Sequence, residues 1–231
     1  MARKETAPGF AFNVSPIKEG GLFAATVGIA LCGYVVGPRY IKRDYLRCDS
    51  STINRFDRGA VRWHSRVLGP LSYAIGAAAF ITPVIVSIRD RGFGRKLAED
   101  LWVYAETFAV STALNIVTKT LVQRPIPGLY TGLYPELEKK ASGYRSFYSG
   151  HTAQITGALV ASAIMSHLRG QKRVWPWALA AIGTAAISVA RVGAGRHFYS
   201  DVAAGALAGG MVGSLVPLLH PVRCCIGESG G

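Results

Sequence analysis

Six apolar runs, each close to the length of a membrane-spanning helix, limit what this chain can fold into more than any other feature. They lie near residues 21–37, 67–88, 101–118, 151–168, 174–190 and 202–219. A helix rising ~1.5 Å per residue needs ~20 residues to cross ~30 Å of hydrocarbon. A soluble bundle with buried helices is the alternative, but run length disfavours it. We therefore predict an all-α fold, an integral-membrane six-helix bundle.

The composition agrees with a basic membrane protein. Half of the 231 residues are hydrophobic, and the formal net charge is +13. This combination suits a basic membrane protein, because an ordinary soluble chain seldom carries several apolar runs of spanning length. The first twenty residues carry Arg3, Lys4 and Lys18 without an apolar core, so we do not interpret them as a cleaved signal peptide. We predict an N-terminal tail over 1–20, a six-span membrane domain over 21–220 and a C-terminal tail over 221–231.

With six spans, the loops 38–66 and 119–150 and the connector 191–201 share one membrane face. The first loop carries apolar residues and arginines in antiphase, both at the spacing of an amphipathic helix. The apolar positions are Ile53, Phe56, Ala60, Trp63 and Val67, and the basic ones are Arg55, Arg58, Arg62 and Arg66. Such a helix can attract anionic headgroups at the interface, or it can serve only as a topological anchor.

The tripeptide Ser149-Gly150-His151 stands directly before the fourth apolar run. This position predicts a helix N-terminus, where unpaired backbone N–H groups and the positive end of the helix dipole attract an anion. Gly150 lets the backbone approach closely, and Ser149 either donates to the anion or only caps the helix. The tripeptide is therefore a candidate anion site.

A second polar cluster occupies the connector before the last run. Arg191 is followed by His197 and then by Asp201. If the last helix starts near His197, the histidine and the aspartate at i and i+4 share one face, so the carboxylate can hold one imidazole nitrogen and expose the other. This arrangement prepares an imidazole as a nucleophile, although a His-x-x-x-Asp pair can also be a structural hydrogen bond.

Basic residues follow the third run on the same predicted face. Lys119 ends the run and Arg124 comes five residues later. Both could be cations that snorkel at a helix end. Together with His151, Arg191 and His197, however, they would form a site suited to phosphoryl chemistry.

Two features inside the runs bear on packing. Gly205, Gly209 and Gly213 recur every four residues in the last run, which predicts a small-residue face for close helix contact. Glu106 lies inside the third run, and roughly 20 Å of helix separates it from Lys119. We therefore leave Glu106 out of the candidate site.

These blocks resemble the type 2 phosphatidic acid phosphatase family, membrane lipid phosphate phosphatases related to vanadium haloperoxidases. The family pattern is Lys-x6-Arg-Pro, then Pro-Ser-Gly-His, then Ser-Arg-x5-His-x3-Asp, and the resemblance covers residues 55–219. Three positions differ: Ile126 stands where the family has arginine, Tyr148 replaces its proline, and Ala190 replaces its serine. Either Arg124 reaches back to the phosphate, or one cationic contact is missing.

The resemblance implies a metal-independent phosphatase, with the membrane domain 21–220 as its phosphatase domain. His197, oriented by Asp201, would attack phosphorus to form a phosphohistidine. His151 would protonate the leaving alkoxide and later activate water. Five residues would bind the phosphate: Lys119, Arg124, Ser149, Gly150 and Arg191.

The same resemblance implies the partners and the location of the protein. We expect a lipid phosphate substrate, the lipid bilayer as surroundings, no cofactor, no metal and no nucleic acid. We also expect an integral protein of a bacterial inner membrane, with its site facing the periplasm or the outside. The rival functions are a lipid phosphotransferase that uses the same phosphohistidine, and a non-catalytic membrane protein that binds phospholipid headgroups.

Overall fold

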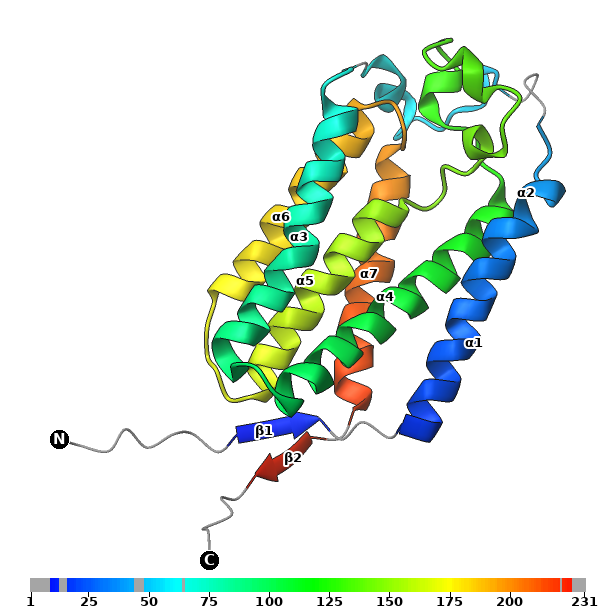
Figure 1. Ribbon diagram of the computed structural model, residues 1–231. Coiled ribbons are helices and arrows are strands. Elements are labelled where there is room, and N and C mark those ends of the chain that lie inside the picture. Colours follow the sequence, from blue (N-terminus) through cyan, green and yellow to red (C-terminus); the bar gives the residue numbers. More distant parts are fainter. Residues whose placement is uncertain (1–8, 13–15, 44–47, 64, 221, 226–231) are drawn as a thin grey trace, which may run out of the picture.

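The computed structural model describes residues 9–12, 16–43, 48–63, 65–220 and 222–225. Helices dominate these residues, and six of the helices are long (Figure 1). The long helices are α1 (Pro16–Val35), α3 (Leu68–Arg91), α4 (Arg95–Val122), α5 (Gly150–Leu168), α6 (Trp175–Gly193) and α7 (Tyr199–Leu219). A short helix, α2 (Gly37–Tyr40), follows α1. Two short strands, β1 (Gly9–Phe12) and β2 (Val222–Cys225), pair antiparallel and join segments of the two predicted tails.

The six long helices coincide with the six apolar runs, but the predicted count of six spans is not matched. Within the described residues, three helices are long and apolar enough to cross a membrane: α3, α6 and α7. Lys18 and Glu19 lie in the first turn of α1, and α4 buries Asp100 and Glu106. Most of α5 is buried among other helices, including the serines and threonines that lower its hydropathy.

Close packing of α5 against α7 forms the centre of the bundle. The predicted glycine face of α7 makes this contact. A Cβ added to Gly205 would lie 2.6 Å from the carbonyl oxygen of Ser149, and one added to Gly209 or Gly213 would overlap the backbone of Ala153 or Gly157. The prediction of close helix contact is confirmed, because any larger residue would push the two backbones apart.

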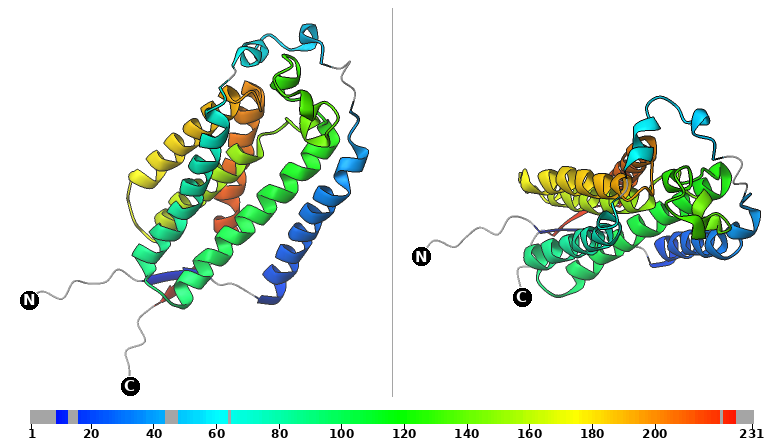
Figure 2. Two further views of the ribbon diagram at one scale, coloured as in Figure 1. Left: turned by 45° about the horizontal axis from the view of Figure 1, so that its top comes forward. Right: turned by 90° about the horizontal axis from the view of Figure 1, so that it is seen from above.

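The two long loops and the connector between α6 and α7 gather at one end of the bundle, the upper end in Figure 1. The β1–β2 ribbon lies at the opposite end (Figures 1 and 2). This arrangement follows from the alternation of the long helices, which run up and down in turn. The predicted gathering of the loops at one end is therefore confirmed.

The amphipathic helix predicted over residues 53–67 does not form. A 3-10 turn, η2 (Ser50–Thr52), precedes this segment, and within it the described residues make one more 3-10 turn, η3 (Arg58–Arg62), before α3 begins at Leu68. The side chain of Asn54 accepts a hydrogen bond from the backbone N–H of Asp57 at 2.9 Å, which competes with a helical turn. Asp57 itself is fully buried and points toward α7. The apolar stripe is divided accordingly: Ile53 is buried and Phe56 is 67% exposed.

Candidate active site

A cavity of about 370 Å³ lies at the loop end of the bundle. Six basic or imidazole side chains line it: Lys119, Arg145, His151, Arg191, Arg196 and His197. Among the residues that the structure describes, no aspartate or glutamate lines it. The cavity therefore offers concentrated positive charge to an anion, and five of the residues selected from the sequence for phosphoryl chemistry line it: Lys119, Gly150, His151, Arg191 and His197.

The N-terminus of α5 forms one wall of this cavity. The helix begins at Gly150, and the hydroxyl of Ser149 accepts hydrogen bonds from the backbone N–H and the hydroxyl of Thr152 at 3.4 and 2.9 Å. Ser149 is fully buried and does not line the cavity, so its contacts are those of a helix cap. A Cβ at Gly150 would lie 2.6 Å from Oδ1 of Asn115, which explains the glycine.

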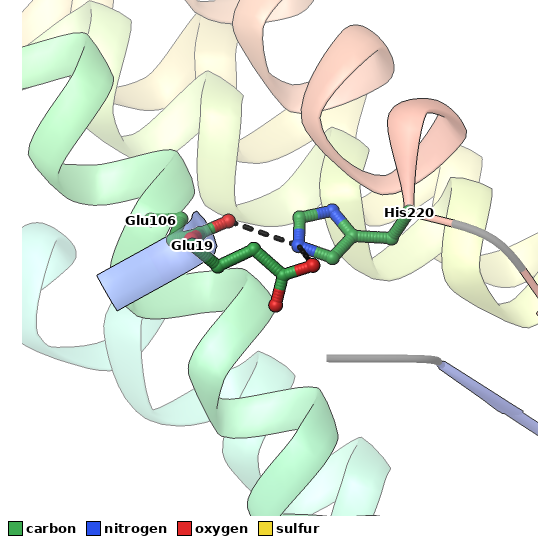
Figure 3. Close-up of side chains that lie close together, drawn as sticks. All are labelled: Glu19, Glu106 and His220. Atoms are coloured by element: carbon green, nitrogen blue, oxygen red, sulfur yellow. Dashed lines mark ion pairs between the residues drawn. The ribbon is translucent and has the colours of Figure 1, made fainter. Parts of the chain in front are cut away.

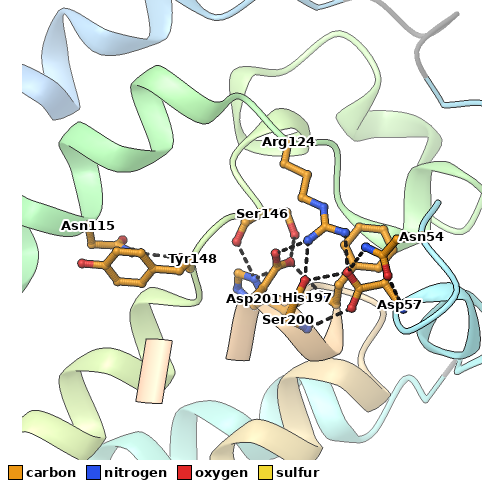
Figure 4. Close-up of polar contacts among 10 residues, drawn as sticks. Asn54, Asp57, Asn115, Arg124, Ser146, Tyr148, His197, Ser200 and Asp201 are labelled. Carbon is orange, nitrogen blue, oxygen red and sulfur yellow. Dashed lines mark hydrogen bonds and ion pairs between the residues drawn. The ribbon is translucent and has the colours of Figure 1, made fainter. Parts of the chain in front are cut away.

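His197 lies in the connector between α6 and α7 and is 3% exposed. Its Nδ1 is 2.8 Å from the carbonyl oxygen of Ser146 (Figure 4). Because a carbonyl can only accept, Nδ1 carries the proton in the neutral ring and Nε2 carries a lone pair. The geometry therefore prepares the ring nitrogen that a nucleophile needs.

Asp201 acts on His197 mainly through Ser146. Its Oδ2 is 3.7 Å from Nδ1 of His197, too far for a direct hydrogen bond. The same oxygen accepts hydrogen bonds from the Ser146 hydroxyl and from the backbone N–H of Phe198. His197 and Asp201 lie close together, but His197 precedes α7, so the two do not share a helix face as predicted. The orienting contact is made by the backbone carbonyl of Ser146, whose hydroxyl donates to Asp201 (Figure 4).

Arg124 does not line the cavity. Its guanidinium bridges two fully buried carboxylates, with Nη2 at 2.7 Å from Oδ2 of Asp57 and Nη1 at 2.7 Å from Oδ1 of Asp201. Ser200 joins this network through hydrogen bonds to both Arg124 and Asp57 (Figure 4). These contacts correct the predicted role of Arg124: its guanidinium is engaged behind the candidate nucleophile rather than in the cavity.

Asp57 is the network residue that sequence reasoning missed. Burial by itself would raise the pKa of this carboxyl, but hydrogen bonds from Arg124, Ser200 and Asn54 outweigh it and hold the pKa below its ordinary value. Asp57 is therefore ionised at neutral pH and can pair with Arg124. No local signal in the sequence marks it, because its partners lie 67 and 143 residues away.

Two cavity cations were also missed, Arg145 and Arg196. Arg196 stacks over the ring of Tyr134, with 3.9 Å between the guanidinium carbon and the ring centroid. Arg145 donates to the carbonyl oxygen of Gly33 at 3.2 Å. Arg196 stands directly before His197, and Arg145 stands four residues before Ser149, so each lies beside a motif already singled out. They provide the positive charge that Ile126, which also lines the cavity, lacks.

Arg191 and His151 complete the cavity wall. Arg191 is buried and donates to the hydroxyl of Ser72 at 3.2 Å, while its Nε has no hydrogen-bond partner. His151 is half-buried and packs edge-to-face on Tyr73, with 5.5 Å between the ring centroids. Both side chains are thus held by a neighbouring residue and line the cavity.

Burial lowers the pKa of His197 to about 4, and the nearby negative charge of Asp201 opposes this shift only in part. A histidine that ordinarily titrates near ~6.5 is then neutral, and nucleophilic, until the pH falls through about 4. We expect the acidic limb of kcat/KM that belongs to His197 to lie near pH 4. The measurement is a pH profile of kcat/KM, corrected for the separately titrated ionisation of the substrate. A corrected limb near pH 6.5 would contradict the buried, neutral ring.

Comparison with known proteins adds one finding. A family model described as the PAP2 superfamily matches residues 100–223, which is more than half of the chain. No curated protein and no solved structure matches. The matched segment contains Lys119, His151, Arg191, His197 and Asp201.

Proposed function

Because the chain belongs to the PAP2 superfamily, we propose that it is a membrane lipid phosphate phosphatase that works without metal and through a phosphohistidine. Members of this superfamily are phosphatases, which supports a phosphoric monoester hydrolase in general. The observation that carries the finer proposal is the cavity itself: a buried imidazole with a free Nε2, a second imidazole and four cations around one space.

In the proposed reaction, Nε2 of His197 attacks the phosphorus, and the bond to the leaving lipid oxygen breaks. His151 gives a proton to that oxygen and releases the lipid alcohol. Burial and the charge of Arg191 hold the pKa of this imidazole at about 3 in the free cavity, so the negative charge of the bound phosphate has to raise the pKa for this step. His151 then takes a proton from water as the water attacks the phosphohistidine, which releases inorganic phosphate and restores both rings. Lys119, Arg145, Arg191 and Arg196 stabilise the negative charge on the phosphoryl oxygens. Magnesium in phosphoryl-transfer enzymes is bound through carboxylates, and the described cavity lining offers none.

Two apolar cavities beside the charged one support a lipid substrate. One of about 350 Å³ lies between α1 and α4 and shares Tyr34 and Thr112 with the charged cavity. Another of about 280 Å³ lies among α3, α4 and α5 and shares Gln154 with it. A phosphate held by the cations would thus have apolar space for its hydrocarbon tail within reach. Three helices suited to spanning support a membrane location; we propose a bacterial inner membrane with the site facing outward.

The test is phosphate release by detergent-purified protein without added metal, on phosphatidic acids that share a headgroup and differ in chain length, beside a soluble short-chain phosphate. We expect release that prefers the long chains. In the variant Ala30→Phe, which fills the cavity between α1 and α4, KM for the long-chain substrate should rise about fivefold, which is ~1 kcal/mol, with little change for the soluble one.

The matched control is Ala24→Phe, because Ala24 is exposed on the same helix and lines neither cavity. This variant should leave KM for both substrates unchanged. Equal effects of the two variants would remove the proposed tail site. A folded protein that releases no phosphate from any lipid would overturn the hydrolase, and acceptor lipids would then test for phosphotransfer.

A further inference from the structure

A second cluster of ionisable side chains lies away from the phosphate cavity. It consists of Glu19 from the first turn of α1, Glu106 from α4 and His220 at the C-terminal end of α7 (Figure 3). Their three nearest ligand atoms all lie within 4.8 Å of one another. None of these residues lines the candidate active site. The proposed phosphatase reaction therefore gives this cluster no role.

The orientation of His220 shows which of its nitrogens faces the glutamates. Nδ1 lies 2.8 Å from the carbonyl oxygen of Val216, so Nδ1 carries the proton in the neutral ring and Nε2 carries a lone pair. Nε2 is 3.0 Å from Oε2 of Glu106 and 4.0 Å from Oε1 of Glu19. It makes no hydrogen bond, although His220 is only 7% exposed. A buried lone pair thus faces two carboxylates, which is unfavourable unless a cation lies between them.

The charge of the cluster is not balanced by the protein. Within the part of the chain that the structure describes, the only ion pairs of Glu19 and Glu106 are those with His220. Even if His220 were protonated, its one positive charge would balance only one of the two carboxylates. Asp100, also buried in α4, differs in this respect, because it pairs with Arg169 and Arg91. The fold therefore supplies arginines to one buried carboxylate of α4 and none to the other.

We propose that Glu19, Glu106 and His220 bind one divalent first-row transition metal ion, with Zn²⁺ as the best match. Zinc accepts imidazole nitrogen and carboxylate oxygen at ~2.0–2.2 Å, and ligand atoms around a tetrahedral ion are then about 3.3 Å apart. The two measured separations from Nε2, 3.0 and 4.0 Å, lie on either side of this value. Small rotations of the flexible glutamate side chains would close the site.

The hydrogen bonds that orient the proposed ligands are of the kind found around bound metal ions. A ligating histidine usually donates its other N–H to a carbonyl, as His220 does to Val216. The indole N–H of Trp102 donates to Oε1 of Glu106 at 3.1 Å and directs the other oxygen, Oε2, to the cluster. Oε2 of Glu19 is buried without a partner and can provide a further bond. The ion would tie α1 to α4 and to the end of α7, and its binding would stabilise the folded state.

The experiment measures metal directly. The full chain, purified in detergent with a tag that contains no histidine, is stripped with chelator, given Zn²⁺ alone, desalted and analysed by elemental mass spectrometry. We expect about one zinc per chain. His220→Gln, Glu106→Gln and Glu19→Gln should each weaken zinc binding at least about tenfold. Zinc should also raise the melting temperature of the wild-type protein and not that of the variants.

The matched control is His167→Gln, because His167 is exposed and lies outside the cluster. It should keep the zinc, and so should His197→Ala, which separates this site from the catalytic histidines. Glu19→Gln is the variant least able to disturb folding, since Glu19 is the least buried of the three ligands. Less than a stoichiometric amount of zinc in the wild type, or zinc retained in a folded Glu19→Gln or His220→Gln, would overturn the proposal. Phosphatase activity plays no part in either outcome.

Discussion

Replacing His197 with alanine should lower kcat/KM for phosphate release by at least about a thousandfold, because the variant lacks the nucleophile of the proposed reaction. The ring is 3% exposed and its Nδ1 is held by the carbonyl of Ser146, which fixes Nε2 as the free ring nitrogen that the variant lacks. The measurement is phosphate release under substrate-limiting conditions. A rapid-quench experiment with a radiolabelled phosphate substrate adds a second readout: label should transfer to the wild-type chain and not to the variant.

The control for this variant is His167→Ala, which removes an exposed histidine and should leave turnover unchanged. Binding of inorganic phosphate should survive in His197→Ala, because the four cavity cations remain. Turnover of this variant close to that of the wild type would contradict the phosphohistidine mechanism. Phosphate binding in a wild-type protein that shows neither turnover nor labelling would instead identify a headgroup-binding protein.

Replacing Arg124 with alanine should have the second-largest effect. The change leaves Asp57 and Asp201, both fully buried, without their shared cation. Removing one partner from a buried ion pair costs about 3–5 kcal/mol of folding stability. Since Asp201 holds Ser146 and Ser146 holds His197, kcat should also fall by at least about tenfold. Thermal unfolding in detergent and steady-state kinetics measure the two effects.

Inhibition by inorganic phosphate decides how Arg124 acts. A positioning residue outside the cavity should leave the inhibition constant within about twofold, whereas loss of a charge-assisted phosphate contact, worth ~1.5–3 kcal/mol, should raise it at least about tenfold. Arg196→Ala is the matched comparison, because Arg196 lines the cavity and should show the larger shift. Arg124→Lys should rescue only part of the stability, since an ammonium cannot bridge two carboxylates as a planar guanidinium does. A phosphate inhibition constant raised in Arg124→Ala as much as in Arg196→Ala would contradict the positioning role.

Local patterns in the sequence were sufficient to predict where the long helices lie and where several of them end. Apolar runs of spanning length identified all six long helices, and Ser149-Gly150-His151 located the start of α5 to the residue. The pattern failed over residues 53–67, where an amphipathic helix was expected and the described residues make only a 3-10 turn, η3. There the side chain of Asn54 and the burial of Asp57 override the periodicity.

By itself, the sequence determined the family motifs, the helical character of the chain and the gathering of His151, Arg191 and His197 at one end of the bundle, because these depend on local periodicity and on the alternation of helices. Only the tertiary structure decided which other residues surround them. It placed Arg124 between Asp57 and Asp201, brought Arg145 and Arg196 into the phosphate cavity, and set His220 against Glu106 and Glu19. Such pairs join residues far apart in the chain, and the long-range packing that brings them together leaves no periodic pattern along the sequence.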